Sequence, residues 1–156
     1  MQEIEFRGFD LDLKKWIYGG YHKHIKRQVS PIGDELKEND IQYLIIISGF
    51  ADWNMPRPLQ VATNIDPKSI GQYIVLKDKN GKKIYDGDIL KDDEGRLFVI
   101  EYKFGGFNLV PLSCSLNCLN DEFSWNPLGD MQTATFVEEN CEVIGNTYQN
   151  PELLEK

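Results

Sequence analysis

The chain is poor in cysteine and has no pattern typical of a secreted protein. Its 156 residues include three cysteines, Cys114, Cys118 and Cys141, and this odd number argues against a framework of paired disulfides. The first residues, MQEIEFRG, lack the charged segment and the following apolar segment of a signal peptide. We therefore expect a protein of the reducing cytoplasm.

Long apolar runs and an excess of positive charge are also absent. The longest apolar run, Tyr43 to Ile47 with Ile41 just ahead, is far shorter than the ~20 residues of a membrane span. The formal net charge is −8, which repels phosphate backbones and anionic membrane surfaces. We expect a soluble protein with no membrane role, whose partner is a protein or a small molecule rather than nucleic acid.

The sequence holds no recognisable catalytic motif. A glycine-rich phosphate loop, a nucleophile elbow and the HExxH motif of metalloproteases are all missing. We therefore predict that the protein is not an enzyme and that it has no catalytic residue, no cofactor and no bound metal.

The clearest pattern that is present is a β-hairpin from Gln72 to Leu90, QYIVLKDKNGKKIYDGDIL. A period-two pattern leads to Asp78 to Gly81, residues that tolerate the positive φ of a tight turn. Tyr85 to Asp88 then turns the chain into another strand. This stretch predicts a fold and indicates no chemistry.

Further strands are predicted on both sides of this hairpin. Arg96 to Phe104 alternates with period two and ends with Tyr102 and Phe104 on the face of Phe98, and IQYLIII, from Ile41, suits a central strand. The other predicted elements are a hairpin from Glu3 to Tyr18, a strand from Leu59 to Thr63, a turn capped by Asp66 and begun by Pro67, a strand from Cys141 to Thr147 and a helical turn from Pro151.

Short strands with a glycine at each corner describe a small antiparallel barrel better than a helical or α/β fold. The predicted class is mainly β. A boundary near Asp66 divides the chain into a β-rich region over residues 1–65 and a barrel region over residues 66–156 that ends in a helical turn.

Three blocks of the sequence resemble the YopX family of small phage and prophage proteins. EIEFRGFD is similar to the opening strand of the family, with Gly8 and Phe9 where the family commonly has Ala and Trp. QYIVLKDKNGKKIYDGDIL is similar to the core block, with Ile74 and Val75 where the family commonly has Thr and Gly. EVIGNTYQNPELL, residues 142–154, is similar to the closing strand and helical turn.

The resemblance spans both ends of the chain and covers Lys23 to Met55 only weakly. It implies a phage or prophage protein in a bacterial host, with a carboxy-terminal SH3-like barrel in which a Gly-Asp-Ile corner opens a strand. It implies no activity, because the family has no established one.

Asp86 and Asp88 flank Gly87, and a D-x-D pair of this kind can bind a divalent cation or act in acid-base chemistry. Carboxylates that accept backbone N–H groups in a turn explain the same residues without any ligand. We favour the turn.

His22 and His24 share one face of a predicted strand and could complete a zinc site with Cys114 and Cys118. The Cys-x3-Cys spacing is unusual for zinc, and two small buried hydrophobic residues explain it better. No cysteine has a helix-start or basic setting that would favour a nucleophilic thiolate.

Two stretches are candidates for a binding surface. Lys23, Lys26 and Arg27 form, with His24, a basic cluster, and the whole stretch Tyr18–Arg27 has the composition of a small nucleic-acid contact. A charged edge strand protected against aggregation explains it at least as well. The loop Ser48 to Pro58 carries Phe50 and Trp53, which either recognise a partner or cover the IQYLIII strand.

We therefore predict a non-enzymatic accessory protein that binds a phage or host protein or serves assembly, and that forms a homo-oligomer. The alternative is a nucleic-acid-binding protein that uses Tyr18–Arg27, and an enzyme is third.

Overall fold

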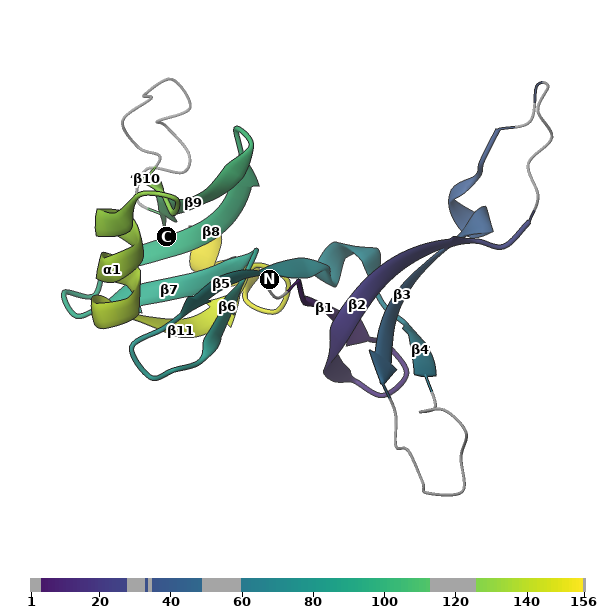
Figure 1. Cartoon of the computed structure of the whole chain (residues 1–156), viewed down its shortest axis with the longest axis horizontal. Coiled ribbons are helices and arrows are strands. Elements are labelled where there is room, and N and C mark those ends of the chain that lie inside the picture. The colour runs from purple at the N-terminus through teal and green to yellow at the C-terminus, as the bar shows by residue number, and fades with distance from the viewer. Residues whose placement is uncertain (1–3, 28–32, 34, 49–59, 113–125, 156) are drawn as a thin grey trace. The chain divides into compact units, whose positions relative to one another are not determined.

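The computed structural model describes residues 4–27, 33, 35–48, 60–112 and 126–155. The chain divides into two compact units, which we call the N-terminal unit (Ile4–Ile70) and the C-terminal unit (Gly71–Lys156 with Met1–Glu3). Both are built from antiparallel strands, and one α-helix is present among the described residues (Figure 1). The prediction of a mainly β protein with antiparallel strands is confirmed.

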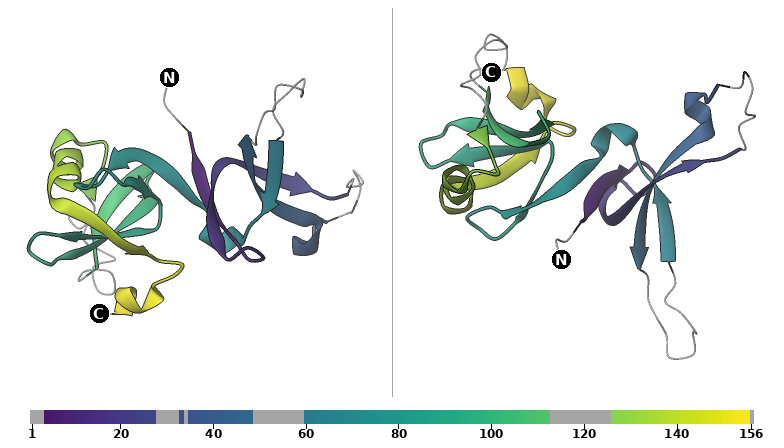
Figure 2. Two further views of the ribbon diagram at one scale, coloured as in Figure 1. Left: turned by 90° about the horizontal axis from the view of Figure 1, so that it is seen from below. Right: turned by 45° about the horizontal axis from the view of Figure 1, so that its top comes forward.

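The N-terminal unit is a sheet in which a long strand joins two hairpins. The strand order is β4-β3-β2-β1. Strand β2 pairs with β1 through its first half and with β3 through its second half, and β2 and β3 run side by side in Figures 1 and 2. The elements are β1 (Phe6–Asp10), β2 (Lys15–Ile25), the 3-10 turn η1 (Glu38–Asp40), β3 (Ile41–Ser48), β4 (Gln60–Asn64) and the 3-10 turn η2 (Pro67–Ser69).

One face of this sheet forms the small core of the N-terminal unit. Ile17, Ile45 and Ile65 are buried there, and Ile45 lies on β3, which has strands on both sides as predicted for IQYLIII. Gly8 lies opposite Ile17 in the sheet, and a side chain at Gly8 would collide with Ile65. Gly8 therefore leaves the space that the Ile65 side chain occupies.

The turn η2 is capped as predicted. The Asp66 carboxylate accepts the Lys68 N–H at 2.9 Å, and Pro67 occupies the first helical position. Ser69 then accepts the Phe9 N–H at 2.7 Å through its hydroxyl. This bond connects the turn to β1 within the same unit.

The C-terminal unit contains a hairpin and a five-stranded sheet of order β10-β9-β8-β7-β11. No pairing between the described strands closes this sheet into a barrel, so the SH3-like detail stays a prediction. The elements are the hairpin strands β5 (Gly71–Lys77) and β6 (Lys83–Tyr85), the sheet strands β7 (Asp88–Asp92), β8 (Leu97–Lys103), β9 (Gly106–Pro111), β10 (Asn126–Pro127) and β11 (Cys141–Asn146), the helix α1 (Met131–Asn140) and the 3-10 turn η5 (Pro151–Glu155).

Apolar side chains are buried on both faces of the five-stranded sheet. On one face, Leu90 and Ile100 pack with Ile74 and Ile84 of the hairpin and with Val137 of α1. On the other face, the buried residues pack against the two leucines of η5, and this cluster consists of Ile89, Val99, Val110 and Leu112. The alternation of β7, β8 and β9 thus supplies two cores, one on each side.

Helix α1 and a backbone irregularity in β5 are features that the sequence patterns did not predict. The Asp130 carboxylate caps α1 by accepting the Thr133 N–H at 3.2 Å, and only Val137 of this helix is buried. In β5 the register shifts between Tyr73 and Lys77, and Val75 takes a φ of 69°. That conformation is rare for a β-branched residue, and the family commonly has glycine there.

No helix among the described residues is both long enough and apolar enough to cross a membrane.

Candidate functional site

The basic stretch Tyr18–Arg27 lies mostly on strand β2. Strand alternation points Tyr18, His22 and His24 to the face opposite the core, and all three are exposed. Lys23 is also exposed but pairs with Tyr43 and points to the other face. The basic cluster of the sequence is therefore divided between two faces of the sheet.

Arg27 takes part in the structure of the N-terminal unit. Its Nε lies 3.0 Å from Oδ2 of Asp40, and its Nη2 donates to the Glu35 carbonyl at 3.1 Å. The N–H of Lys37 donates to the same Asp40 oxygen, and this bond, followed by Arg27, holds the pKa of Asp40 below its usual value. Arg27 thus connects the end of β2 to the start of β3, and its predicted contact with a ligand stays a prediction.

Tyr21 is part of the core edge. Its ring lies 5.5 Å from the ring of Phe6, and burial, followed by the neighbouring Tyr43, raises its pKa. Of the two tyrosines in the stretch, only Tyr18 is exposed, at 46% of its surface. A planar ligand on this sheet would therefore meet Tyr18 and the two histidines rather than Tyr21.

The possible zinc site cannot be assembled from the residues that the structure describes. His22 and His24 have ring centroids 6.1 Å apart, but Cys114 and Cys118 lie outside the described residues. Within the described part of the chain, no three His, Cys, Asp or Glu side chains are grouped to hold a metal ion. Phe50 and Trp53, predicted to recognise a partner or cover a strand, also lie outside the described residues.

Asp86, Gly87 and Asp88 form a structural corner. The buried Asp88 carboxylate accepts the Tyr85 N–H at 2.8 Å, and Asp86 accepts the Tyr102 N–H at 3.2 Å. Gly87 has a φ of 81°, and its N–H and carbonyl bond to Ile100 and Thr147. These contacts agree with the interpretation of Asp86–Asp88 as a turn that needs glycine.

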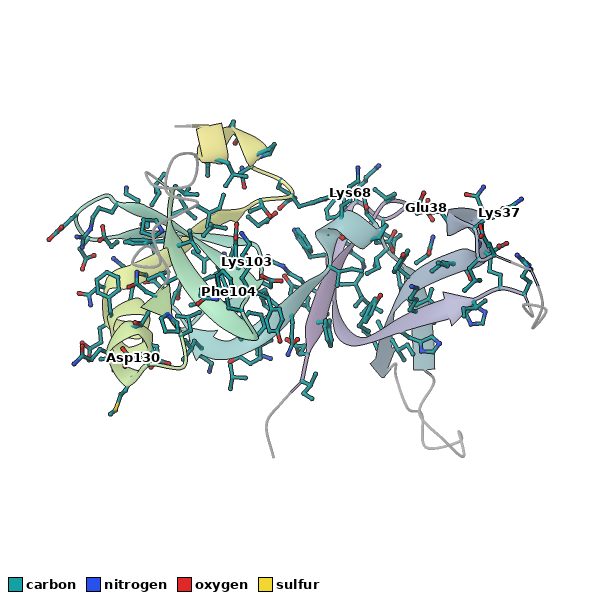
Figure 3. The ribbon with its side chains drawn as sticks, turned by 90° about the horizontal axis from the view of Figure 1, so that it is seen from above. Lys37, Glu38, Lys68, Lys103, Phe104 and Asp130 are labelled. Carbon is teal, nitrogen blue, oxygen red and sulfur yellow. The ribbon has the colours of Figure 1, made fainter. Side chains whose placement is uncertain are left out.

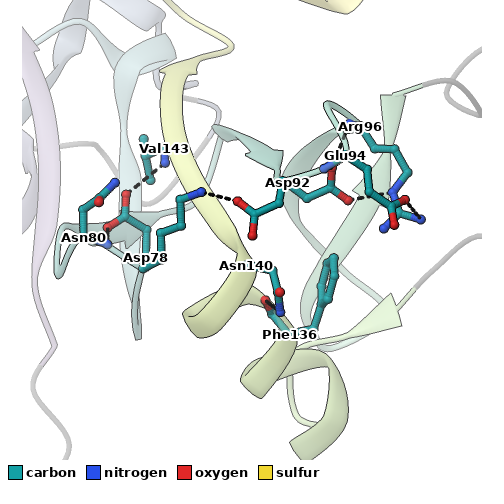
Figure 4. A network of polar contacts seen from close by, with 10 residues as sticks. Asp78, Asn80, Asp92, Glu94, Arg96, Phe136, Asn140 and Val143 are labelled. Atoms are coloured by element: carbon teal, nitrogen blue, oxygen red, sulfur yellow. Dashed lines mark hydrogen bonds and ion pairs between the residues drawn. The ribbon is translucent and has the colours of Figure 1, made fainter.

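Two further buried carboxylates organise turns of the C-terminal unit (Figure 4). Asp78 accepts the N–H groups of Asn80 and Lys82, both at 2.9 Å, and that of Val143 on β11 at 3.0 Å. Asp92 accepts two N–H groups of its own turn and the Arg96 guanidinium at 2.6 Å. Both carboxylates accept hydrogen bonds from backbone N–H groups, and these bonds hold the turns in place.

Cys141 is fully buried between these turns. Burial, followed by the nearby Asp92, raises the pKa of its thiol to about 11. A thiol with this pKa is protonated at neutral pH and does not act as a nucleophile.

The most exposed aromatic side chain of the described residues lies at the end of the β8–β9 hairpin. Phe104 is 85% exposed, with φ 54°, and Gly105 follows with φ 82°; Lys103 pairs with Gly106 on either side. Two residues with positive φ form a type I′ turn, whose first position favours Asn, Asp or Gly. Phe104 and Lys103 are labelled in Figure 3.

Two more aromatic residues belong to the same hairpin, within three residues of Phe104. Tyr102 is 56% exposed, and its ring meets the ring of the cross-strand Phe107 edge to face at 5.1 Å. We call Tyr102, Phe104 and Phe107 the aromatic hairpin tip.

The period-two pattern of Arg96 to Phe104 predicts Phe104 on the face of Phe98, and for Phe104 this prediction is wrong. The strand ends at Lys103, and Phe104 belongs to the turn. The sequence offered one sign that Phe104 is unusual. It is a bulky apolar residue directly before Gly105-Gly106, at a turn position that favours Asn, Asp or Gly.

Charge is divided unequally between the units. Residues 4–70 contain nine Lys or Arg and nine Asp or Glu, which sum to zero. Residues 1–3 and 71–156 contain eight Lys or Arg and sixteen Asp or Glu. This difference accounts for the whole net charge of −8. The repulsion of polyanions therefore originates in the C-terminal unit.

Comparison with known proteins identifies a family and similar solved structures. The family model described as YopX protein matches residues 5–155 of the chain. Protein EF1440 from Enterococcus faecalis, known from a crystal structure, is 22% identical, with 99% of each chain covered and a TM-score of 0.47. No curated protein matches the chain.

Proposed function

The chain belongs to the YopX family, and we propose that it is a phage or prophage accessory protein that binds another protein in the cytoplasm of its bacterial host and catalyses no reaction. The phage origin rests on the resemblance of its three sequence blocks to this family. The protein-binding role rests on the aromatic hairpin tip.

Phe104 supports this role because it is costly for the isolated fold. The left-handed backbone costs an L-residue about 1–2 kcal/mol, and an 85% exposed ring gains little from burial. Asparagine or glycine would serve the turn better. A residue that opposes its local structure in this way is typical of a functional position.

The surroundings of Phe104 favour a protein partner. Tyr102 adds exposed aromatic surface, Phe107 supports it from a partly buried position against the core, and aromatic residues are enriched at the centres of protein interfaces. The nearby charges of Glu101 and Lys103 are paired at 2.7 Å. The unit that carries the tip has a net charge of −8, which suits a basic or neutral protein surface and not a phosphate backbone.

Capture from lysate of the phage-carrying host tests this proposal. We expect the wild-type protein to retain a partner that Phe104→Asn binds about 30-fold or more weakly, as for an interface hot spot. Asparagine accepts a positive φ, so the melting temperature should stay equal or rise.

Met131→Gln is the matched control for this experiment. Met131 is 79% exposed in the same unit, at the start of α1, and its loss should leave the partner bound. A partner that is retained equally by Phe104→Asn would contradict the proposal.

A second candidate function is nucleic-acid binding through Tyr18–Arg27. It is supported by the zero net charge of the N-terminal unit and by the exposed row of Tyr18, His22 and His24. Fluorescence anisotropy with labelled oligonucleotides at physiological salt tests it. We expect no tight binding; submicromolar binding that is lost when Lys23, Lys26 and Arg27 become alanine would reverse our ranking.

We further propose that the five-stranded sheet and the β5–β6 hairpin are parts of an SH3-like barrel. Support comes from the meander β7-β8-β9, from β11 next to β7, and from the hairpin side chains Ile74 and Ile84 that pack on the sheet. An experimental structure in which β10 and β11 remain unconnected edges would contradict this.

A further inference from the structure

We propose that strand β4 is the self-association surface of this protein and that two copies join their N-terminal sheets through antiparallel β4–β4 pairing about a twofold axis at Ala62. This goes beyond the proposed function, because the aromatic hairpin tip lies in the other unit. The partner is a second copy of the same chain.

Strand β4 is an edge with free pairing capacity. Within the described residues it pairs with β3 on one side only. The Ile65 N–H donates to the Tyr43 carbonyl at 3.0 Å, so Thr63 and Val61, two and four residues earlier, also direct their backbone groups toward β3. The N–H and C=O groups of Gln60, Ala62 and Asn64 therefore point away from β3.

These outward groups are self-complementary. In antiparallel pairing about Ala62, Ala62 faces its own copy, and Gln60 faces Asn64 of the second copy. Each of these pairs can exchange two N–H···O bonds, while Val61 comes opposite Thr63, two residue types that suit strands. The result is one continuous intermolecular sheet without a side-chain charge in either β4 strand.

The other described strands at sheet edges have features that disfavour pairing with a second copy. Strand β6 has three residues with Lys83 among them, and β10 has two residues and includes Pro127. The outer side of β11 is occupied, because Cys141 accepts the Lys79 N–H and Val143 donates to Asp78. Strand β4 has five residues, no proline and no charge, and Val61 is 39% exposed.

The charge distribution favours a second copy at this edge. The N-terminal unit has a net charge of zero, so two copies meet there without mutual repulsion. Association through the C-terminal units would bring two charges of −8 together, which is unfavourable at low salt.

Hydrogen exchange of the wild-type protein tests the proposed geometry without any mutation. At concentrations where light scattering gives twice the 18.0 kDa of one chain, the amides of Ala62 and Asn64 should exchange at least about tenfold more slowly than in dilute monomer. The amides of Val61 and Thr63 point toward β3 and should be protected equally in both states. A monomer at all concentrations, or a dimer without this alternation, would overturn the proposal.

Charge variants at Ala62 provide the second test. The side chain is exposed, so Ala62→Lys and Ala62→Glu should fold, as circular dichroism can verify. Each variant alone places like charges opposite each other at the twofold axis and should be monomeric, whereas an equal mixture should form heterodimers.

Leu13→Lys, at a position that is 61% exposed in a loop of the same unit, adds the same charge away from β4 and should remain dimeric. Phe104→Asn should also remain dimeric, which separates this inference from the proposed function. Lysine and glutamate variants that dimerise like the wild type would overturn the proposal.

Discussion

The two units of this protein share antiparallel strands but differ in how they are stabilised. The core cluster of the N-terminal unit has three buried residues, whereas the two clusters of the C-terminal unit have eight and four. Buried carboxylates organise the turns of both, with Asp10 in the first and Asp78 and Asp92 in the second. Because burial of apolar surface is the main stabilising contribution, we expect the C-terminal unit to be the more stable one.

The difference teaches that sheet formation and core formation are separate requirements. The N-terminal unit has long paired strands and little apolar volume around them, so it leaves an edge and a face available for contacts. The C-terminal unit covers both faces of its sheet, and its main exposed apolar feature is at the hairpin tip, on a turn. We therefore propose two different kinds of contact surface, a strand edge in the N-terminal unit and the aromatic hairpin tip in the C-terminal unit.

The largest expected effect comes from truncating one fully buried residue in each unit. Leu90→Ala should cost about 3–5 kcal/mol of the free energy of unfolding, and Ile45→Ala about 2–3 kcal/mol, because fewer buried neighbours surround Ile45. Urea unfolding monitored by NMR amide signals of each unit measures both. Ile144→Ala, at a 39% exposed position, should change stability by less than about 0.5 kcal/mol. If Leu90→Ala and Ile45→Ala lose the same free energy of unfolding, the two cores do not differ in how much they stabilise their units.

A backbone substitution in the C-terminal unit should have the next largest effect. Gly87→Val places a β-branched residue at φ 81°, with its Cβ 3.0 Å from the Thr147 hydroxyl, and should cost about 1–3 kcal/mol. Gly106→Val is the control, because the backbone φ there is not in the left-handed region and no atom lies within 4 Å of the new Cβ. Thermal unfolding compares the two variants. If both melt like the wild type, Gly87 does not need its glycine.

Acid should weaken the Asp92 turn. Burial raises the pKa of Asp92, but hydrogen bonds from the Arg96 side chain and from backbone N–H groups outweigh burial and lower it. A carboxyl whose pKa is lower in the folded state contributes stability above its ordinary pKa of about 3.9 and loses that contribution as pH falls through the folded value.

Asp92→Asn should therefore cost about 1–3 kcal/mol near neutral pH, and its difference from the wild type should shrink below about pH 4. Denaturant unfolding at a series of pH values measures this. A difference that stays constant from pH 7 to pH 3 would show that the charge of Asp92 does not matter.

The smallest expected effect concerns Val75. The φ of 69° at Val75 destabilises the folded state by about 1–2 kcal/mol, and glycine would remove this strain. Glycine also loses more backbone entropy on folding, which costs about 0.5–1 kcal/mol. Val75→Gly should thus stabilise the protein by up to about 1 kcal/mol. Val61→Gly, at a similarly exposed position of β4 in the other unit, should destabilise it. If calorimetry finds that Val75→Gly and Val61→Gly lower stability by the same amount, Val75 is not strained.

Features with local causes were predictable from the sequence. The Asp78 to Gly81 turn, the Asp66 cap before Pro67 and the Gly87 corner all follow from residues that favour one backbone conformation. The central place of β3 followed from its apolar residues on both faces. The candidate site was less accessible: the basic stretch was visible, but its division between two faces depends on the register of β2 with β3.

The sequence by itself determined the mainly β class, the family and the positions of most strands and turns, because period-two patterns and turn residues act over a few neighbours. Tertiary structure decided the rest. Helix α1 has only Val137 buried, so its position depends on packing against distant strands; Phe104 is exposed because Lys103 pairs with Gly106 and ends the strand. Strand β4 is an edge because of the order in which strands pair. Such contacts join residues far apart in the chain, and no local pattern encodes them.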